Sequence, residues 1–253
     1  MVTTNKLPQQ LSIKLGNILF KYAFPVYNRV YPWFKRKQDA DEIAFLKLAI
    51  KPGHTILDIG ANIGFYSRLL GKLTGEKGIV YAFEPDPVNH KHLLKNTAGI
   101  VAIRPFQKAV AEKTKTLELY TSKLLNVDHR TYKVDDYDQA ISIEAVSIDE
   151  FLPKGTKVDF IKMDIQGFEF SALQGMKETI AYNPEIKIVM ELWPYGLKKA
   201  GTDYLHFIAF LEGLGLTIKK MHQGKEVDFD KNEVNPLLNY PPEYYFNLSL
   251  SKK

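Results

Sequence analysis

The sequence predicts an α/β fold in which a mostly parallel sheet is covered by helices on both faces. Short apolar runs such as residues 158–165 and 186–192 have the composition of strands that are buried on both sides. Amphipathic stretches with helical spacing alternate with these runs along the chain. The last two runs, residues 216–222 and 243–252, have no helix between them. We therefore expect a seven-stranded main sheet with one antiparallel strand.

The first half of this fold follows a regular strand and helix order. Asp39 is expected to cap a helix over residues 41–50, and the Lys-Pro-Gly-His turn at 51–54 then leads into the first strand. A loop with two glycines separates that strand from the next helix. The remaining elements of this half are strands at residues 55–60, 79–85 and 103–111 and helices at residues 64–73 and 87–97.

The second half begins with an added β element. Residues 115–122 and 141–148 alternate apolar and polar side chains, which predicts two strands around a long loop at 122–140. The remaining elements are strands at residues 158–165, 186–192, 216–222 and 243–252 and helices at residues 170–180 and 204–215. The last of these helices is closed by glycine.

Composition restricts the class of protein. The 253 residues are 45% hydrophobic and 25% charged, which is typical of a globular chain with one large domain and a terminal appendage. We divide the chain into a basic helical arm (1–40) and a main domain (41–253). The chain has no cysteine, so it has no disulfide and no thiolate metal site, and we assign no metal ligands. This composition suits a reducing compartment, and we expect a cytoplasmic protein.

The positive charge of the chain is concentrated in the arm. Residues 1–38 hold seven Lys or Arg and no Asp or Glu, which leaves 27 basic and 29 acidic groups in the other 215 residues. Proteins that bind nucleic acid spread basic residues over their binding surface. Because the main domain is close to neutral, we expect no nucleic-acid partner.

The arm contains an amphipathic helix. Its apolar stripe consists of Leu11, Leu15, Ile18, Leu19 and Tyr22. Basic residues and two prolines, Pro25 and Pro32, interrupt the arm, so no apolar run reaches the ~20 residues that a membrane-spanning helix needs. Two interpretations stay open. The helix packs on the domain as a lid or as a contact in a homo-oligomer, or residues 11–37 lie on an anionic membrane or a lipid-linked substrate.

The carboxyl ends of the predicted strands bring several polar residues to one rim. Residues 58–64, Glu84, Ala109 and Asp164 each end or follow a strand, and ligands of such sheets bind at this edge. The loop Gly60-Ala61-Asn62-Ile63-Gly64 lacks the middle glycine of a dinucleotide fingerprint and the Gly-Lys-Ser/Thr of a P-loop. Asp58 before this loop would repel a phosphate.

S-adenosylmethionine fits this rim better than a nucleotide that carries phosphates. Its ammonium group suits Asp58, its carboxylate suits the backbone N–H groups at the start of the following helix, and the glycines leave room for its methionine part. Glu84 ends the second strand, twenty residues beyond Gly64, where an acid accepts hydrogen bonds from ribose hydroxyls. The order of these features predicts a cofactor site for S-adenosylmethionine.

A second informative stretch follows the strand at 158–165. Lys162, Asp164, Gln166 and Glu169 gather at its end, and Gly167 permits a tight turn into the next helix. Because unpaired buried charges are costly, Lys162 and Asp164 should pair or face the cleft. For Glu169 a structural role as an acid near a helix N-terminus stays open.

These stretches together resemble one known family. The segments ILDIGANIGFYS, AFEPDP, VSIDEFL, VDFIKMDIQGFEFSALQGM and IVMELWP, between residues 54 and 195, resemble the FkbM-like S-adenosylmethionine-dependent methyltransferases. The resemblance implies a Rossmann-like class I methyltransferase fold and methyl transfer to a hydroxyl of a sugar, glycan, glycolipid or other small molecule. The expected cofactor contacts are Asp58, Gly60, Asn62, Gly64, Phe65, Tyr66, Glu84, Pro85 and Ala109. Gln166 stands where family members commonly carry an acid, which disfavours a metal site built from three carboxylates.

Methyl transfer to a hydroxyl requires a base near the acceptor oxygen. Asp164 is our first candidate because of its place on the rim. His129 is the second because the ordinary pKa of a histidine side chain suits a base near neutral pH. His129 lies in a polar cluster on the long loop, and a solvated surface loop stays open as the alternative. Arg130 could hold an anionic group of the substrate. The expected substrate contacts are Asn126, Asp128, Arg130, Gln166 and Glu169.

Other classes of function stay open beside methyl transfer. A nicotinamide-dependent oxidoreductase is disfavoured because Asn62 occupies the place of a fingerprint glycine. A catalytically silent module that binds the cofactor would show the same rim. An RNA methyltransferase is disfavoured by the near-neutral main domain.

Overall fold

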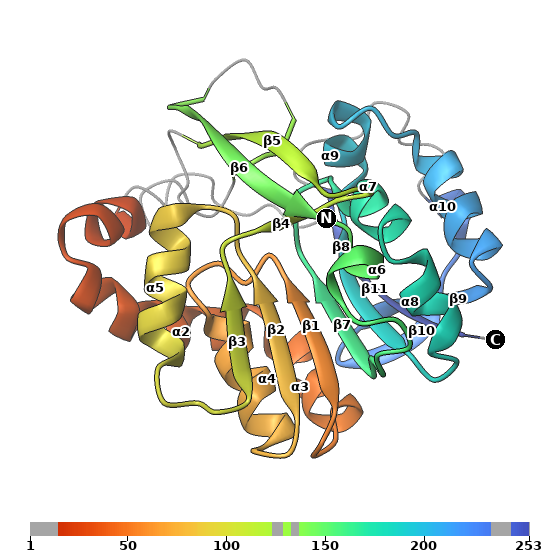
Figure 1. The fold of residues 1–253 in the computed structure, drawn as a ribbon, viewed down its shortest axis with the longest axis horizontal. Helices are drawn as coiled ribbons and strands as arrows, with labels where there is room; N and C mark the ends of the chain where they lie inside the picture. Colours follow the sequence, from red (N-terminus) through yellow and green to blue (C-terminus); the bar gives the residue numbers. More distant parts are fainter. Residues whose placement is uncertain (1–14, 123–128, 133–136, 234–243, 253) are drawn as a thin grey trace.

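The main sheet of the protein has eight strands in the order β10-β9-β11-β8-β7-β1-β2-β3. The structure is a computed structural model that describes residues 15–122, 129–132, 137–233 and 244–252 (Figure 1). The strands are β1 (Thr55–Ile59), β2 (Ile79–Phe83), β3 (Ile103–Phe106), β7 (Phe160–Met163), β8 (Lys187–Leu192), β9 (Leu216–His222), β10 (Lys225–Asp228) and β11 (Phe246–Lys252). The five neighbouring strands β8, β7, β1, β2 and β3 pair in parallel. Strand β11 runs antiparallel between β8 and β9. The expected α/β class with an antiparallel strand is confirmed.

The eighth strand, β10, was not expected from the sequence. It forms a hairpin with β9 through Gln223 and Gly224, whose φ angles are 49° and 70°. Positive φ at both residues gives a tight turn whose backbone twist matches that of the two flanking strands. All four residues of β10 are exposed, so no apolar alternation marks it in the sequence.

Helices cover both faces of the main sheet because its strand residues alternate between two apolar cores. Ile56 of β1 faces a core that includes α3 (Ala40–Ala49), α4 (Phe65–Thr74) and α5 (Pro87–Thr97). Leu57 and Ile59 face the opposite core, whose helices are α6 (Ile148–Phe151), α7 (Glu169–Gln174), α8 (Lys177–Tyr182), α9 (Pro194–Lys199) and α10 (Tyr204–Gly213). Burial on both faces explains why the parallel strands are continuous apolar runs.

Two predicted elements are each divided in the structure. The helix expected over residues 170–180 is divided into α7 and α8 at Gly175, where a Cβ would lie 2.0 Å from the carbonyl oxygen of Ala111. The strand expected over 103–111 is split into β3 and the short β4 (Ala109–Val110), which leaves the main sheet.

The added β element is a separate three-stranded sheet in the order β4-β6-β5. It contains β5 (Lys115–Tyr120) and β6 (Ala140–Val146), close to the two added strands predicted. Figure 1 shows this sheet above the carboxyl ends of β1, β2 and β3. It therefore covers the edge at which a ligand of the main sheet would bind.

The N-terminal arm consists of a helical segment at residues 15–22 and helix α2 (Phe24–Gln38). Pro25 lies in the first turn of α2, where a missing N–H costs nothing, and Pro32 lies inside the helix. Pro32 therefore does not end the helix. Asp39 precedes α3, but its side chain makes no capping hydrogen bond and instead accepts one from the Tyr66 hydroxyl at 2.6 Å. No helix of the described part of the chain is long and apolar enough to span a membrane.

The arm is held on α5 by specific contacts. Phe24 stacks on His92 with ring centroids 3.3 Å apart. The side-chain amides of Asn28 and Asn96 bond to each other in both directions, at 2.8 and 3.0 Å, and Asn96 also donates to the carbonyl of Ile63 at 2.7 Å. Asn96 thus links the arm to the glycine loop after β1. That residues 1–40 form a separate unit stays a prediction.

We expect Asn96→Ala to loosen the arm while leaving the core intact. The change removes three hydrogen bonds worth about 1 kcal/mol each. Amide hydrogen exchange over residues 15–38 should become roughly tenfold faster or more, with little change over β1 and β7. Lys95→Ala, on the exposed side of the same helix, is the matched control. Unchanged exchange of the arm in Asn96→Ala would contradict the proposed anchoring.

Candidate active site

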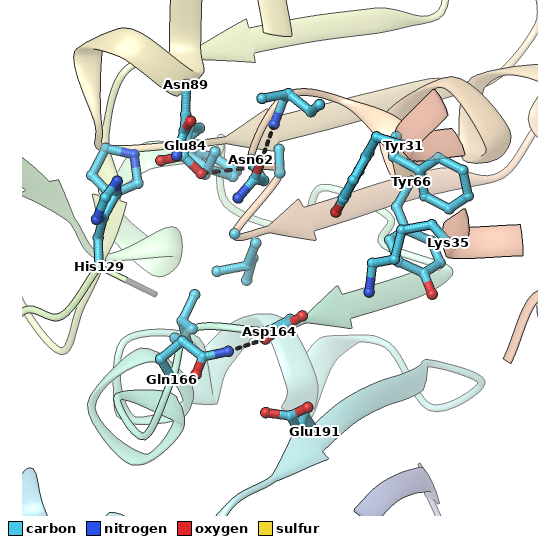
Figure 2. Close-up of a pocket in the computed structure, with 18 of the residues that line it drawn as sticks. Tyr31, Lys35, Asn62, Tyr66, Glu84, Asn89, His129, Asp164, Gln166 and Glu191 are labelled. Carbon is cyan, nitrogen blue, oxygen red and sulfur yellow. Dashed lines mark hydrogen bonds between the residues drawn. The ribbon is translucent and has the colours of Figure 1, made fainter. Parts of the chain in front are cut away.

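A cavity of about 510 Å³ opens at the carboxyl ends of the parallel strands. Its wall includes the loops after β1, β2 and β7 and the end of β8, and residues of the arm close another side. Figure 2 shows side chains from these separate segments converging on one space. Since parallel α/β sheets bind ligands at this edge, the cavity is the candidate active site.

The loop after β1 brings two backbone segments into direct contact. Gly60 has φ +86°, and a Cβ there would lie 2.0 Å from the carbonyl oxygen of Asp164. Any side chain would strain the loop and push the ends of β1 and β7 apart. Gly64 also has a positive φ, but its missing side chain makes room for Leu93 of α5, and Gly64 does not line the cavity.

Three further residues expected to contact the cofactor lie on the cavity wall. They are Asn62, Phe65 and Tyr66. Asn62 adopts the left-handed φ of 51°, and its side-chain oxygen accepts a hydrogen bond from the N–H of Ile63 at 2.7 Å. An asparagine tolerates this conformation, which explains how the loop turns without a middle glycine.

Glu84 lines the cavity with a carboxyl group that the backbone holds in place. One oxygen accepts a hydrogen bond from the N–H of Asn62 at 2.8 Å, and the other accepts one from the N–H of Asp86 at 3.0 Å. Burial raises the pKa of Glu84 to about 8, although the two N–H donors act in the opposite direction. A fixed acceptor of this kind is suited to bind a pair of neighbouring hydroxyls.

The wall beside Glu84 is largely apolar. Pro85 and Ala109 line the cavity there, as expected, together with Phe83, Val110 and Leu119. Figure 2 shows Asn89 close to Glu84 on this side. This combination of a hydroxyl acceptor and apolar surface fits an adenosine group.

Asp58, like Gly64, is an expected cofactor contact that the structure does not place on the cavity wall. Its side chain is fully buried at the end of β1. One oxygen accepts a hydrogen bond from the Ser67 hydroxyl at 2.6 Å, and the other has no hydrogen-bond partner among the described residues. Burial raises the pKa of Asp58, and the charge of Lys162 opposes this rise. Asp58 thus tethers α4 to β1 behind the wall.

Lys162 is a buried positive charge among carboxylates. Its ammonium group lies 3.9 Å from Oε1 of Glu42 and 4.1 Å from the ring centroid of Tyr66. Burial by itself lowers the pKa of Lys162, but the charges of Glu42, Asp164 and Asp58 outweigh burial and raise it. Lys162 therefore stays charged and faces the cavity, in agreement with the sequence prediction.

Asp164 and Glu191 lie together at the ends of β7 and β8. Both line the cavity, and Figure 2 shows their carboxyl groups on the same side of it. Gln166, also on the wall, has φ +55° and donates a hydrogen bond to Asp164 at 3.0 Å. Burial raises the pKa of Glu191 to about 9, and the charges of Asp164 and Glu169 add to this rise. Glu191 is therefore protonated at neutral pH.

Glu191 was missed by the sequence analysis, although its position carried a signal. An acid near the end of a buried apolar strand is the same pattern that marks Asp58 and Glu84. Here it lies inside the quoted segment IVMELWP. What the pattern alone could not show is that β7 and β8 are neighbours in the sheet.

Glu169, expected to contact substrate, does not line the cavity. Its Oε1 accepts hydrogen bonds from the N–H groups of Ile165 and Gly167 at 3.3 and 3.2 Å. The side chain is almost fully buried, and burial raises its pKa to about 7. It holds the turn between β7 and α7, and its expected contact with substrate stays a prediction.

The polar cluster on the long loop is divided in the structure. His129 lines the cavity, with Nδ1 accepting from the N–H of Ser122 at 3.2 Å and Nε2 3.9 Å from Asp86. Arg130 does not line it, because its guanidinium group lies over the ring of Trp193 at 5.0 Å. Asn126 and Asp128 lie outside the described residues. The expected substrate contact of Arg130 therefore does not occur in this arrangement.

The arm contributes wall residues that carried no sequence motif. Tyr31 and Lys35 point into the cavity from α2 (Figure 2). Lys35 forms an ion pair with Asp39 at 2.7 Å, and carboxylates around it outweigh burial and raise its pKa. The positions of the Tyr31 and Lys35 side chains depend on where α2 passes the edge of the main sheet. Among the described residues, no cluster of three or more potential metal ligands is present.

We expect the buried glutamates to make the protein less stable as the pH rises. The folded-state pKa of Glu191 (about 9) lies above that of an exposed glutamate, so the native state keeps a proton that the unfolded chain has lost. Its contribution is full below about pH 4.5 and is lost as the pH rises toward 9, by up to about 1.4 kcal/mol per pH unit.

Scanning calorimetry tests this expectation. Glu191→Gln should match the native chain at pH 5 and exceed its Tm at pH 8, whereas the exposed control Glu76→Gln should track the native chain throughout. A native Tm that rises from pH 5 to 8, or a Glu191→Gln variant without an advantage at pH 8, would contradict the assigned burial effect.

Known proteins resemble this chain in sequence and fold. The family model of the methyltransferase FkbM domain matches residues 58–217. The 2-O-methyltransferase NoeI of Sinorhizobium fredii (strain NBRC 101917 / NGR234) is 27% identical over 152 residues, which cover 53% of this chain and 62% of NoeI. This chain therefore spans less than two thirds of that relative.

A solved methyltransferase structure shares the fold. A putative rRNA-methylase from Clostridium thermocellum superposes with a TM-score of 0.52 at 12% identity, covering 84% of this chain and 94% of that chain. The methyltransferase FkbM from Methylobacillus flagellatus KT has a TM-score of 0.49 at 20% identity, covering 78% of this chain and 43% of that one. With its family domain matched over more than half of its length, the chain belongs to the FkbM family of S-adenosylmethionine-dependent methyltransferases.

Proposed function

We propose that this methyltransferase transfers the methyl group to a hydroxyl of a sugar, glycan, glycolipid or other small molecule. The observation that carries the proposal is the pair of carboxyl groups, Asp164 and Glu191, on the cavity wall. A hydroxyl acceptor must lose a proton, and Asp164 could accept that proton while the neighbouring Glu191 donates a hydrogen bond. The similarity to a relative named as a 2-O-methyltransferase supports an oxygen acceptor.

The residues of the cavity fit S-adenosylmethionine. Glu84 would accept hydrogen bonds from the ribose hydroxyls, and the apolar wall around Pro85 and Ala109 would hold the adenine. The close backbone approach at Gly60 leaves space for the methionine part. One carboxyl oxygen of Asp58 has no hydrogen-bond partner among the described residues. From behind the glycine loop, this carboxyl group would attract the ammonium group of the cofactor. When bound, the cofactor supplies a methyl group made electrophilic by its sulfonium.

Asp164 is the proposed general base. Gln166 donates to one of its oxygens at 3.0 Å, which orients the carboxylate and leaves the other oxygen for the acceptor hydroxyl. The charge of Asp164 also acts on the buried ammonium group of Lys162. Glu191, protonated at neutral pH, would donate a hydrogen bond to a second polar group of the acceptor. Gln166 and Lys35 complete the polar surface that a sugar would meet.

His129 is better placed to support the cofactor than to act as the base. Figure 2 shows it beside Glu84, across the cavity from Asp164 and Glu191. Its Nε2 lies 3.9 Å from Asp86, the residue that caps α5 through hydrogen bonds from the N–H groups of Val88 and Asn89. A base role for His129 would place the acceptor on the adenosine side, so we keep it as the second candidate.

Glu84→Gln should weaken cofactor binding. The amide would face one of the two backbone N–H groups with its own NH₂, so one hydrogen bond is lost and the ribose loses an acceptor oxygen. We expect roughly ten- to hundredfold weaker binding of S-adenosylmethionine by calorimetry. The exposed Glu76→Gln is the control, and equal affinity in both variants would refute the ribose assignment.

Asp164→Asn and Glu191→Gln should separate the two carboxyl groups by function. Asparagine cannot accept the proton, so Asp164→Asn should lower kcat by on the order of 10²-fold or more with near-normal cofactor affinity. Glutamine imitates a protonated glutamate, so Glu191→Gln should keep most of its turnover near pH 7.

The assay incubates the enzyme with labelled S-adenosylmethionine and fractionated sugars, glycolipids and small metabolites, and follows the label. Full turnover in Asp164→Asn, or its loss in Glu191→Gln alone, would reverse the assignment. His129→Gln serves as the comparison for the second candidate base.

A further inference from the structure

The arm has a second face whose apolar side chains are half or more exposed. On α2, Phe24 and Tyr27 turn toward the domain, while Val26, Val30 and Trp33 repeat at helical spacing on the other side. The exposed apolar side chains of the arm are Leu15, Ile18, Tyr22, Val26, Val30, Trp33 and Phe34. Each is at least 50% exposed, and Tyr22 reaches 75%. Such a concentration of apolar surface on one segment marks an interaction site.

Basic side chains accompany this face. Lys21, Arg29, Arg36 and Lys37 are exposed on the same two helical segments, and residues 1–38 contain no acid at all. Lys35 alone among the described basic residues of α2 is turned toward the cavity. A helix with an apolar stripe, aromatic side chains and flanking lysine or arginine has the chemistry of one that lies in the surface of a bilayer.

The apolar face is continuous with the cavity. Val30, Trp33 and Phe34 line the cavity and are also half or more exposed. The mouth of the cavity therefore opens onto the same surface, and Figure 1 places the arm at one edge of the molecule, away from α10. A molecule whose polar head reaches Asp164 could leave its apolar tail along this face.

We propose that this face of the arm docks on an anionic lipid bilayer and presents the cavity to an acceptor anchored in that bilayer. The acceptor part rests on the proposed function, whereas the docking does not. A second copy of the chain suits the face less well. A twofold contact would place the basic side chains of two arms against each other, and like charges repel. Anionic headgroups supply the opposite charge.

Vesicle sedimentation of the full chain tests the docking. Binding to vesicles of phosphatidylcholine with phosphatidylglycerol should exceed binding to phosphatidylcholine alone by more than about tenfold and should fall as salt is added. Trp33 is 67% exposed and Trp193 is buried, so brominated lipids should quench the emission of Trp33. The absence of vesicle binding, or equal binding to both compositions at all salt concentrations, would overturn the proposal.

Paired variants locate the contact. Tyr22→Ser with Val26→Ser changes exposed residues outside the cavity wall and should abolish most vesicle binding while leaving the affinity for S-adenosylmethionine unchanged. Val101→Ser with Tyr182→Ser, equally exposed but remote in sequence, is the control. If sedimentation instead shows a dimer that only the arm variant dissociates, a second copy occupies the face and the proposal fails.

The acceptor is tested separately from the docking. Labelled S-adenosylmethionine is supplied with vesicles of total membrane lipid and with the water-soluble fraction of the same cells. Label in the organic extract supports a bilayer-anchored acceptor, and label in the soluble fraction alone overturns it. Label in neither fraction contradicts the proposed function itself and leaves the vesicle measurements as an independent result.

Discussion

The buried ammonium group of Lys162 is the interaction on which the site depends. It lies on the central strand β7, within 4.1 Å of the ring centroid of Tyr66 and 3.9 Å of Glu42, and its charge acts on Asp58 and Asp164 as well. Without it, several carboxyl groups would share one desolvated region, and each would favour its protonated form. A single cation thus joins α3, α4 and β7 electrostatically.

Acids at four strand ends take different roles because their neighbours differ. Two backbone N–H groups hold Glu84 in place for hydroxyls, whereas Ser67 holds Asp58 behind the wall. Asp164 accepts a hydrogen bond from the side-chain amide of Gln166 and interacts with the charge of Lys162. Glu191 is affected mainly by burial and by the negative charges around it. In the proposed mechanism the same residue types would therefore serve as an acceptor for the cofactor, a tether, a base and a protonated donor.

The arm connects the cofactor loop with the surface. Asn96 bonds both to Asn28 of the arm and to the backbone carbonyl of Ile63 in the glycine loop. A displacement of α2 would therefore be transmitted to Ile63. Because α2 also supplies Tyr31 and Lys35 to the wall, a bilayer that holds its outer face would fix the inner face as well. In this scheme the surface on which the enzyme acts also stabilises the closed wall of its active site.

The sequence by itself determined the fold class, the family, the cofactor and the strand ends that carry Gly60, Glu84 and Asp164, because these follow from local patterns of apolar runs, glycines and acids. Only the tertiary structure decided which of these acids reach the cavity. Asp58 bonds to Ser67 and Glu169 bonds to the turn at 165–167, so neither side chain lines the cavity. Glu191 lines the cavity because β8 pairs with β7. Burial and pairing depend on neighbours that lie far apart along the chain, and no local pattern contains them.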